Sequence, residues 1–381
     1  MIRSYCKSTG KYGLTLFEHG KIVNEQLMIL AGTGSGKNIL EERTVEEVHD
    51  KGYIIFIVDV KNQFEPAFAL FEPDDNYHLQ RLAQQREQPQ TRDIIIYHPF
   101  TFDLPKNKKL PPLEIITYPL PEIRRDGLGF LLESEPDTTP AAMSMFIEEA
   151  DRADAATSLY DVLYNVQEKV KATTGKKKKQ DLKNLFQFGL MGSAAGSMKE
   201  FGQLQFAFEP FLKKDFMIQS ADCPLNLDIK KMFRNHRAYH ILSTKWIKDE
   251  KMRTFAMFMW VQLIIKYREE CRHPVCIIFD EITTYAPYNA KGYKSHVANL
   301  LRNIVKFRNM GKGGMLSLTI GQNFQNIDTR VRTNPGKTLF GNFGVQSEVE
   351  ALKKAFGAHM GPLITSLQRG EFVDVKNALQ D

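Results

Sequence analysis

The stretch Met28-Ile29-Leu30-Ala31-Gly32-Thr33-Gly34-Ser35-Gly36-Lys37-Asn38 decides the fold of this chain. A short apolar run enters a glycine-rich loop that ends in Gly-Lys, and a helix-forming segment follows from Ile39 to Asp50. This order of strand, loop and helix predicts a P-loop nucleotide site. Glycines let backbone N–H groups close around the β-phosphate, while the lysine ammonium reaches the β- and γ-phosphates.

The loop departs from the usual P-loop pattern at two positions. Ala31 stands where glycine is usual, and Asn38 stands where a serine or threonine hydroxyl normally ligates Mg²⁺. A glycine-rich loop by itself can also be a tight turn that holds no ligand. For a nucleotide site, the residues expected to bind the phosphates are Gly32, Thr33, Gly34, Ser35, Gly36, Lys37 and Asn38.

The composition is that of a globular protein of more than one structural unit. The chain has 381 residues, of which 43% are hydrophobic and 25% charged, and domains usually have about 100–200 residues. This excludes a disordered or fibrous protein. The net charge of +6 permits a polyanionic partner but does not require one.

Cysteine spacing and hydropathy indicate the compartment. Cys6, Cys223, Cys271 and Cys276 form no CxxC pair, so neither a zinc site nor a disulfide framework is expected. The first residues lack the apolar core of a signal peptide, and no apolar run approaches the roughly 18 residues that cross a bilayer. We therefore expect a cytoplasmic protein that reaches the inner face of a membrane only through partners.

Apolar strands separated by helical stretches predict a parallel sheet with helices on its faces. A hairpin at 13–21 leads into the P-loop strand, and an apolar run at 53–58 ends in Asp59-Val60-Lys61, where ligands collect in open α/β sheets. A further strand is expected from Asp93 to Tyr97, and the sheet resumes at Ala238–Ser243. The helix expected from Asp249 to Cys271 carries apolar residues at helical spacing, which predicts core packing.

Prolines and then helical segments interrupt this pattern between residues 105 and 235. Helices are expected at 140–171 and 182–190, so we interpret 105–235 as a mostly helical insertion between two halves of a nucleotide-binding domain, 1–104 and 236–381. The lysines at 176–179 in this segment form either a phosphate-contacting loop or a solvated loop tip, and the second is the commoner case.

Two strand ends supply candidate catalytic groups. Val275–Phe279 ends in Asp280 and Glu281, of which the first would hold Mg²⁺ and the second would polarise the water that attacks the γ-phosphate. An acidic strand end at the surface is the alternative. The strand Met315–Ile320 leads to Gln322, whose amide can bond the γ-phosphate and the attacking water, or merely cap a turn.

Basic residues surround this last strand, with Asp328 as the one acidic residue between 300 and 337. So much uncompensated charge could hold DNA phosphates or supply an arginine to a neighbour's ATP. The basic residues are Arg302, Lys306, Arg308, Lys312, Arg330, Arg332 and Lys337.

Taken together, the GTGSGK loop, the Asp59-Val60-Lys61 strand end, the Asp280-Glu281 pair and Gln322 resemble the FtsK/HerA superfamily of hexameric DNA-pumping ATPases. The helical insertion looks most like the type IV coupling proteins. The resemblance covers about residues 25–100 and 235–375, including a closing strand at 367–373, and implies a RecA-like P-loop fold.

The resemblance also implies roles for single residues. Lys37 would bind phosphate, Asp280 would position Mg²⁺ together with Asn38, Glu281 would be the general base and Gln322 the sensor. The family's arginine finger precedes the sensor strand, which makes Arg308 the first choice and Arg302 the second.

The resemblance implies an ATP-hydrolysing ring motor, hexameric like the family, that uses ATP and Mg²⁺ to move DNA for conjugation or secretion. Viral genome packaging and HerA-type DNA processing are alternative functions, because they use the same kind of ATPase. The membrane anchor of most coupling proteins and the amino-terminal barrel of HerA helicases have no counterpart in this sequence. Asn38 motivates a competing hypothesis, a nucleotide-binding scaffold with little hydrolysis.

Overall fold

The computed structural model describes ten segments of the chain and four short strands near its start. The segments are 26–61, 93–100, 113–123, 125–133, 141–174, 194–212, 217–304, 306, 314–333 and 335–374. The four strands are β1 (Tyr5–Cys6), β2 (Lys11–Tyr12), β3 (Phe17–Glu18) and β4 (Lys21–Ile22). β3 and β4 pair antiparallel, so the expected hairpin is present over residues 17–22. The lysine loop at 176–179, the expected helix at 182–190 and Arg308 lie outside the described residues.

The core of the fold is an eleven-stranded sheet with the order β2-β1-β15-β14-β5-β13-β12-β6-β11-β7-β8. Its neighbouring strands are parallel except for the pairs β1–β2 and β14–β15. The strands not yet located are β5 (Gln26–Leu30), β6 (Ile54–Asp59), β7 (Ile94–Pro99), β8 (Leu113–Ile116), β11 (Tyr239–Ser243), β12 (Val275–Phe279), β13 (Met315–Gly321), β14 (Lys337–Phe340) and β15 (Glu371–Asp374). The predicted parallel sheet is therefore confirmed.

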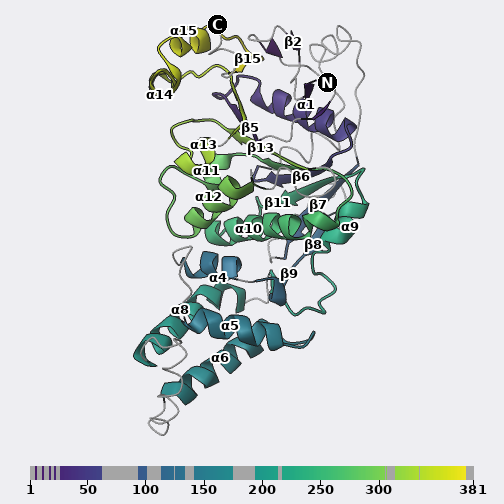
Figure 1. Cartoon of the computed structure of the whole chain (residues 1–381), viewed down its shortest axis with the longest axis vertical. Helices are drawn as coiled ribbons and strands as arrows, with labels where there is room; N and C mark the ends of the chain where they lie inside the picture. Colours follow the sequence, from purple (N-terminus) through teal and green to yellow (C-terminus); the bar gives the residue numbers. More distant parts are fainter. Residues whose placement is uncertain are drawn as a thin grey trace.

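Helices cover both faces of this sheet (Figure 1). They are α1 (Lys37–Asp50), α4 (Arg125–Leu132), α5 (Ala141–Arg152), α6 (Leu159–Thr174), α8 (Ala194–Leu212), α9 (Ile229–Arg234), α10 (Glu250–Tyr267), α11 (Ile282–Tyr285), α12 (Tyr293–Ile304), α13 (Thr329–Arg332), α14 (Gln346–Phe356) and α15 (Met360–Thr365). The described residues also form two short 3₁₀ helices, η1 (Leu120–Glu122) and η2 (Arg268–Glu270), and a small sheet of β9 (Tyr118–Pro119) and β10 (Ile218–Gln219).

Alternation along the strands divides the core into two clusters. In β6, Ile55 and Ile57 pack with the apolar residues of α1, whereas Phe56 and Val58 pack with those of α10 and α12. Successive strand side chains point to opposite faces, so an unbroken apolar run satisfies both clusters. The predicted apolar stripe of α10 is core packing, and Asp249 caps its start by accepting the Met252 N–H at 2.7 Å.

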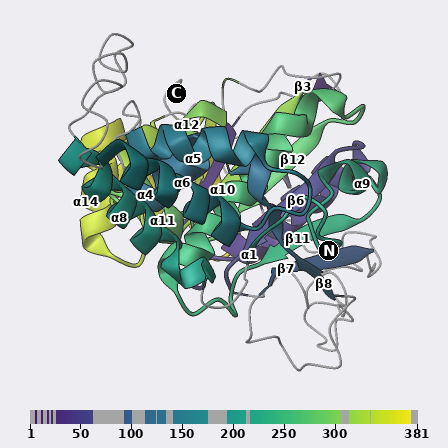
Figure 2. The same ribbon diagram turned by 90° about the horizontal axis from the view of Figure 1, so that it is seen from below.

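The helices α4, α5, α6 and α8 pack together beneath α10, and the view from below shows them in front of it (Figure 2). Their buried side chains belong to the same cluster as the α10 face of the sheet. The loop before α6 is organised by Ser158, whose Oγ accepts from Asp161 N–H at 3.2 Å while its own N–H donates to the Asp161 carboxylate at 3.0 Å.

Two details differ from the sequence expectation. The proline-rich region after residue 105 contains β8, which forms the edge of the main sheet, a position where prolines nearby do not interrupt a ladder. The closing strand covers Glu371–Asp374 rather than 367–373, because Gly370 turns the backbone with φ 84° immediately before it. The division into 1–104, 105–235 and 236–381 stays a prediction. In the part of the chain that the structure describes, no helix could span a membrane.

Candidate active site

Four parallel strands bring the predicted site residues to one edge of the sheet. β5, β13, β12 and β6 are neighbours in that order, and the register pairs Leu30 with Gly321, Phe279 with Thr319 and Phe279 with Val58. Their carboxyl ends lead into the P-loop, Gln322, the Asp280-Glu281 pair and Lys61. Ligands collect at this edge in open α/β sheets.

The glycine-rich loop has the conformation that its sequence predicts. It connects β5 to α1, which begins at Lys37, and the φ angles of Gly34 and Gly36 are 79° and 90°. Both values lie in the left-handed region that glycine adopts without strain. The strands hold the loop by two backbone bonds, from Ala31 N–H to Gly321 O at 3.3 Å and from Gly32 N–H to Asn342 O at 2.9 Å.

Glu281 is the centre of the polar contacts at this edge. Its Oε1 accepts a hydrogen bond from Gln322 Nε2 at 2.8 Å, lies 3.5 Å from Lys37 Nζ and forms an ion pair with Lys61. Burial would raise the pKa of this carboxyl, but the bonds from Lys61 and Gln322 and the charge of Lys37 outweigh it and lower the pKa. Glu281 is therefore ionised at neutral pH.

The backbone of Glu281 is also unusual, with φ 50° and ψ 57° at the residue that precedes α11. A left-handed conformation costs a residue other than glycine roughly 1–2 kcal/mol. Such strain persists where the surrounding structure fixes it, which happens often at functional sites. Here it turns the Glu281 side chain toward Lys37 and Gln322.

Gln322 joins the two halves of the site. Its amide nitrogen donates to Glu281, and its Oε1 lies 3.5 Å from the hydroxyl of Thr33 in the P-loop, at the limit of a hydrogen bond. The residue predicted as sensor therefore contacts both the loop that would hold phosphate and the predicted base. The turn-capping alternative does not describe these contacts.

Asp280 is fully buried, and neither of its carboxylate oxygens has a hydrogen-bond partner among the residues that the structure describes. Burial is the main cause that raises the pKa of Asp280 to about 7, and the neighbouring Asp59 carboxylate raises it further, against the opposing charges of Lys61 and Lys37. The Asp280 charge contributes in turn to the raised pKa of Glu41, which is buried on α1. A buried carboxylate with two unused oxygens fits a divalent cation, which would supply the missing partner.

The oxygens of Asp280 and Asn38 are too few to bind Mg²⁺ alone, but they suit an ion that is also bound by nucleotide phosphates. Mg²⁺ is usually bound through one or two protein carboxylates, waters and substrate phosphates. Asn38 is exposed at the second position of α1 and can offer an amide oxygen. No group of three or more His, Cys, Asp or Glu residues within the described ranges could hold a metal ion. Asp280 and Asn38 thus remain the predicted protein ligands.

Sequence reasoning gave no role to two basic residues at this site. Lys61 was placed at the carboxyl end of β6, but its pairing with Glu281 across 220 positions follows only from the strand order. Arg369 precedes Gly370, whose N–H donates to Ser35 O at 2.7 Å, so this exposed arginine lies beside the P-loop. A Cβ on Gly36 would lie 3.2 Å from Gly370 Cα, so the backbone segments around Gly36 and Gly370 approach each other closely.

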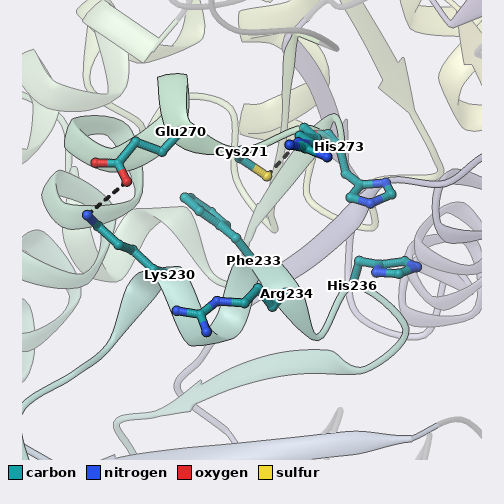
Figure 3. A pocket seen from close by; sticks show the side chains of 8 residues that line it. Lys230, Phe233, Arg234, His236, Glu270, Cys271 and His273 are labelled. Atoms are coloured by element: carbon teal, nitrogen blue, oxygen red, sulfur yellow. Dashed lines mark hydrogen bonds and ion pairs between the residues drawn. The ribbon is translucent and has the colours of Figure 1, made fainter.

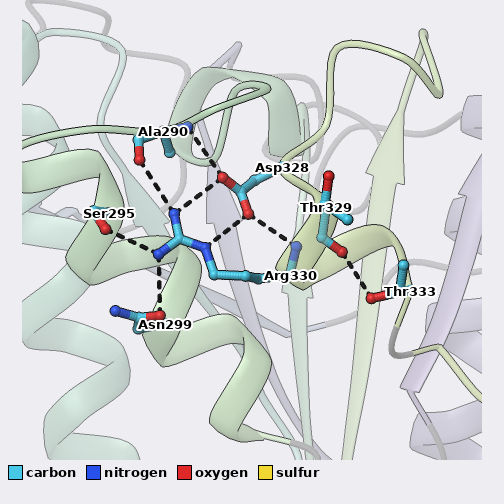
Figure 4. Close-up of polar contacts among 7 residues, drawn as sticks. All are labelled: Ala290, Ser295, Asn299, Asp328, Thr329, Arg330 and Thr333. Carbon is cyan, nitrogen blue, oxygen red and sulfur yellow. Dashed lines mark hydrogen bonds and ion pairs between the residues drawn. The ribbon is translucent and has the colours of Figure 1, made fainter.

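The basic stretch around β13 is less available than its sequence suggested. Arg330 is held inside its own chain, with Nε 2.9 Å from Asp328 Oδ1 and Nη1 2.9 Å from Ser295 Oγ and 3.1 Å from Asn299 Oδ1 (Figure 4). Its Nη2 also donates to Asp328 Oδ2 at 3.0 Å and to Ala290 O at 3.2 Å. Five such bonds make it a structural residue.

Two more members of the stretch are also engaged. Arg332 lies 4.9 Å from the centre of the Phe324 ring and donates to Phe324 O at 3.3 Å, and Lys337 pairs with Asp374 at 3.2 Å. The interpretation of the whole stretch as uncompensated charge is therefore wrong for Arg330 and Lys337, which pair with carboxylates, whereas Arg332 contacts an aromatic ring and a carbonyl. Arg302 and Lys306, by contrast, are exposed and make no ion pair with any residue in the described ranges.

The fold is that of two known proteins. VirB4 of Thermoanaerobacter pseudethanolicus superimposes with a TM-score of 0.56 at 11% identity, over 97% of this chain and 91% of that one. The plasmid coupling protein TrwB, in complex with the non-hydrolysable ATP analogue ADPNP, gives a TM-score of 0.51 at 12% identity, over 98% and 92% of the two chains. No protein-family model matches the sequence, and no curated protein matches it.

At these identities the similarity establishes the fold alone. The predicted RecA-like P-loop fold is confirmed, and so is the resemblance to a coupling protein at the level of the fold.

Proposed function

We propose that this protein is an ATP-hydrolysing ring motor that translocates DNA, and that it resembles the ATPase part of a coupling protein for conjugation or secretion. One observation carries the proposal. Glu281 contacts Lys37 of the P-loop and Gln322, which follows β13, and it lies next to the buried Asp280, which has no hydrogen-bond partner among the described residues. A phosphate cradle, a base, a polar sensor and a metal carboxylate therefore share one edge of the sheet.

The chain's own residues have separate tasks in this proposal. The P-loop and Lys37 bind the phosphates, and Asp280 with Asn38 holds Mg²⁺, which when bound neutralises charge on the transferred phosphoryl group. Glu281 accepts a proton from the attacking water, for which its carboxylate must first exchange the Lys61 contact for water. Gln322 orients that water, because its amide already reaches Glu281.

The arginine finger is proposed to act on a neighbouring subunit. Arg302 is exposed in the last turn of α12 and has no acidic partner in the described part of the chain, whereas Arg330 is consumed by its own network. An arginine supplied in trans raises hydrolysis by roughly 10³–10⁵. Arg308 remains the first choice from sequence and Arg302 the second. Hydrolysis should therefore require a ring, for which a hexamer is proposed.

DNA is proposed as the polymer that passes through this ring, and a membrane-bound complex as the setting in which partners hold the motor. The net charge of +6 and the exposed Arg302 and Lys306 support an anionic partner. The similarity to the coupling protein TrwB favours DNA transfer over genome packaging, although both would use the same chemistry.

The decisive experiment measures the ATPase rate with and without DNA, alongside the mass of the oligomer in ATP and Mg²⁺. Hydrolysis that rises with DNA and follows ring formation supports the motor. ATP binding without turnover, in rings or monomers, would instead establish the nucleotide-binding scaffold that Asn38 motivates. The contact between Glu281 and Gln322, with Asp280 next to Glu281 in the sequence, argues against the scaffold, since a non-hydrolysing binder needs no base.

A further inference from the structure

A cavity of about 390 Å³ lies at the amino ends of the strands, whereas the P-loop lies at their carboxyl ends. His236 precedes β11 and His273 precedes β12, so both histidines lie at the amino ends of parallel strands (Figure 3). β12 has five residues between His273-Pro274 and Asp280, a length of about 16 Å at 3.3 Å per residue. The cavity is therefore separate from the candidate active site and has a volume usual for small-ligand pockets.

Positive side chains dominate the lining of this cavity. Of its eight lining residues, one is acidic, and that residue, Glu270, pairs with Lys230 at 2.8 Å. The other cationic lining residues, Arg234 on α9 and Arg272 after η2, make no ion pair with any residue that the structure describes. Two guanidinium groups without carboxylates favour an anion, because an arginine offers a fork of N–H donors that matches phosphate geometry.

Two of the lining residues, His236 and His273, form a stack. Their ring centres are 4.2 Å apart, and the ring planes differ by 13°. Partial burial and the neighbouring His236 lower the pKa of His273, which favours the neutral form of the His273 ring. Two protonated rings at this separation repel each other. An anion bound beside them would offset that repulsion, because it attracts both charges. An anion in the cavity would therefore favour protonation of the pair.

A buried arginine adds to the positive potential of this corner. Arg268 is fully buried and its guanidinium donates to the carbonyls of Cys271 at 3.2 Å and Gly314 at 2.6 Å. Within the described ranges, its Nε has no hydrogen-bond partner and no carboxylate pairs with it. A buried cation that is balanced only by carbonyl dipoles raises the potential felt by an anion at the adjacent Cys271.

From these observations we propose that the cavity between α9, η2 and the amino ends of β11 and β12 is a phosphate-binding site. Arg234 and Arg272 bind the phosphate group, and the His236–His273 stack gains a proton when it binds. The phosphate is carried either by a nucleic-acid backbone or by a small free molecule, since the chemistry of recognition is the same. The site does not depend on ATP hydrolysis at the P-loop.

The first test uses the full chain with Lys37→Ala, so that pyrophosphate binding at the P-loop is weakened in every protein compared. Calorimetry with pyrophosphate should show a binding event whose affinity falls at least tenfold in Arg234→Ala and in Arg272→Ala. Lys231→Ala is the matched control, because Lys231 lies on the same helix and pairs with Glu114 at 3.7 Å outside the cavity. Equal affinity in parent and arginine variants would overturn the site.

The source of the phosphate follows from a parallel titration with a short oligonucleotide. An oligonucleotide that competes with pyrophosphate and loses affinity in the same two variants identifies a nucleic-acid backbone. Pyrophosphate binding that the oligonucleotide does not reduce identifies a small free molecule. Thermal unfolding of each variant checks that the helix α9 is intact. ATPase measurements on Arg234→Ala and Arg272→Ala with Lys37 intact distinguish failure of this site from failure of the motor.

The second test counts protons. Binding measured in buffers of different ionisation enthalpy should show proton uptake near pH 7 that is smaller in the double variant His236→Asn and His273→Asn. Charged groups facing the stack come from α9 (Lys230 and Arg234), η2 (Glu270) and the loop after it (Arg272), and Glu270 is already paired. Identical proton uptake in both proteins would contradict the role of the histidines.

Discussion

The side-chain amide of Gln322 donates a hydrogen bond to Glu281 Oε1 at 2.8 Å, and that same oxygen is paired with Lys61. The predicted sensor and the predicted base are thus joined directly. Because Gln322 Oε1 also lies 3.5 Å from the Thr33 hydroxyl, a change at the P-loop can be transmitted to the base through one side chain.

Replacing Glu281 by glutamine should abolish hydrolysis and spare ATP binding. The amide keeps the size of the side chain but cannot accept a proton, and loss of a general base typically lowers a rate by about 10²–10⁴. Single-turnover kinetics beside a binding titration with ATP measure both quantities. Wild-type turnover in Glu281→Gln would show that another group is the base.

Replacing Lys61 by alanine should move the acid limb of the activity profile to higher pH. Lys61 is one of the groups that lower the pKa of Glu281, so its removal raises that pKa and protonates the base at a pH where wild type is active. The profile of kcat/KM against pH measures the shift. Lys245→Ala is a control for the loss of one exposed lysine, and it should leave the limb in place. Coincident profiles for Lys61→Ala and wild type would refute the assignment.

Replacing Asp280 by asparagine should stabilise the nucleotide-free protein at pH 8 while it removes Mg²⁺-dependent turnover. The pKa of Asp280 is about 7 in the folded chain and near 3.8 when unfolded, so the folded state binds the proton more tightly. Its contribution to stability therefore falls as pH rises from about 4 to 7. The neutral amide removes this cost, on the order of 1–4 kcal/mol at pH 8.

Thermal unfolding of Asp280→Asn and wild type at pH 4.5 and 8 checks this sign. The gain in stability should be larger at the higher pH. A variant that is less stable than wild type at pH 8 would mean that Asp280 is balanced by a partner other than a metal ion.

Replacing Arg308 by alanine should abolish DNA-stimulated hydrolysis and spare ATP binding, with Arg302→Ala as the second candidate. A finger acts in trans, so a mixture of Arg308→Ala with Glu281→Gln should recover activity at interfaces where an intact finger meets an intact base. Arg330→Ala is the contrasting variant, because loss of its five bonds should lower the unfolding temperature rather than act on catalysis alone. Full activity in both Arg308→Ala and Arg302→Ala would show that this segment does not supply the arginine finger.

Replacing Asn38 by threonine should raise Mg²⁺-dependent turnover if the missing hydroxyl limits metal binding. Asn38 is exposed at the start of α1, so the substitution requires no repacking. A titration of turnover against Mg²⁺ gives the change in apparent affinity, with Asn38→Ala as the variant that offers no ligand. An unchanged curve for Asn38→Thr would show that other ligands hold the metal adequately.

The sequence by itself determined the elements that depend on local pattern. The glycines of the P-loop are required where φ is 79° and 90°, and the apolar runs of β6 and β12 are required where a strand is buried on both faces. Because parallel strands end at one edge, their carboxyl-terminal residues, among them Asp280, Glu281 and Gln322, could be predicted to meet.

Only the tertiary structure decided which charges are available for chemistry. Lys61 reaches Glu281 because β6 lies next to β12, and Arg330 is consumed by Asp328, Ser295 and Asn299, which its position in the sequence does not reveal. The stacked histidines His236 and His273 likewise precede two different strands, β11 and β12, which the long helix α10 separates in the sequence. Charge is counted along a sequence, but pairing depends on distances of a few ångströms, which strand order and side-chain packing set.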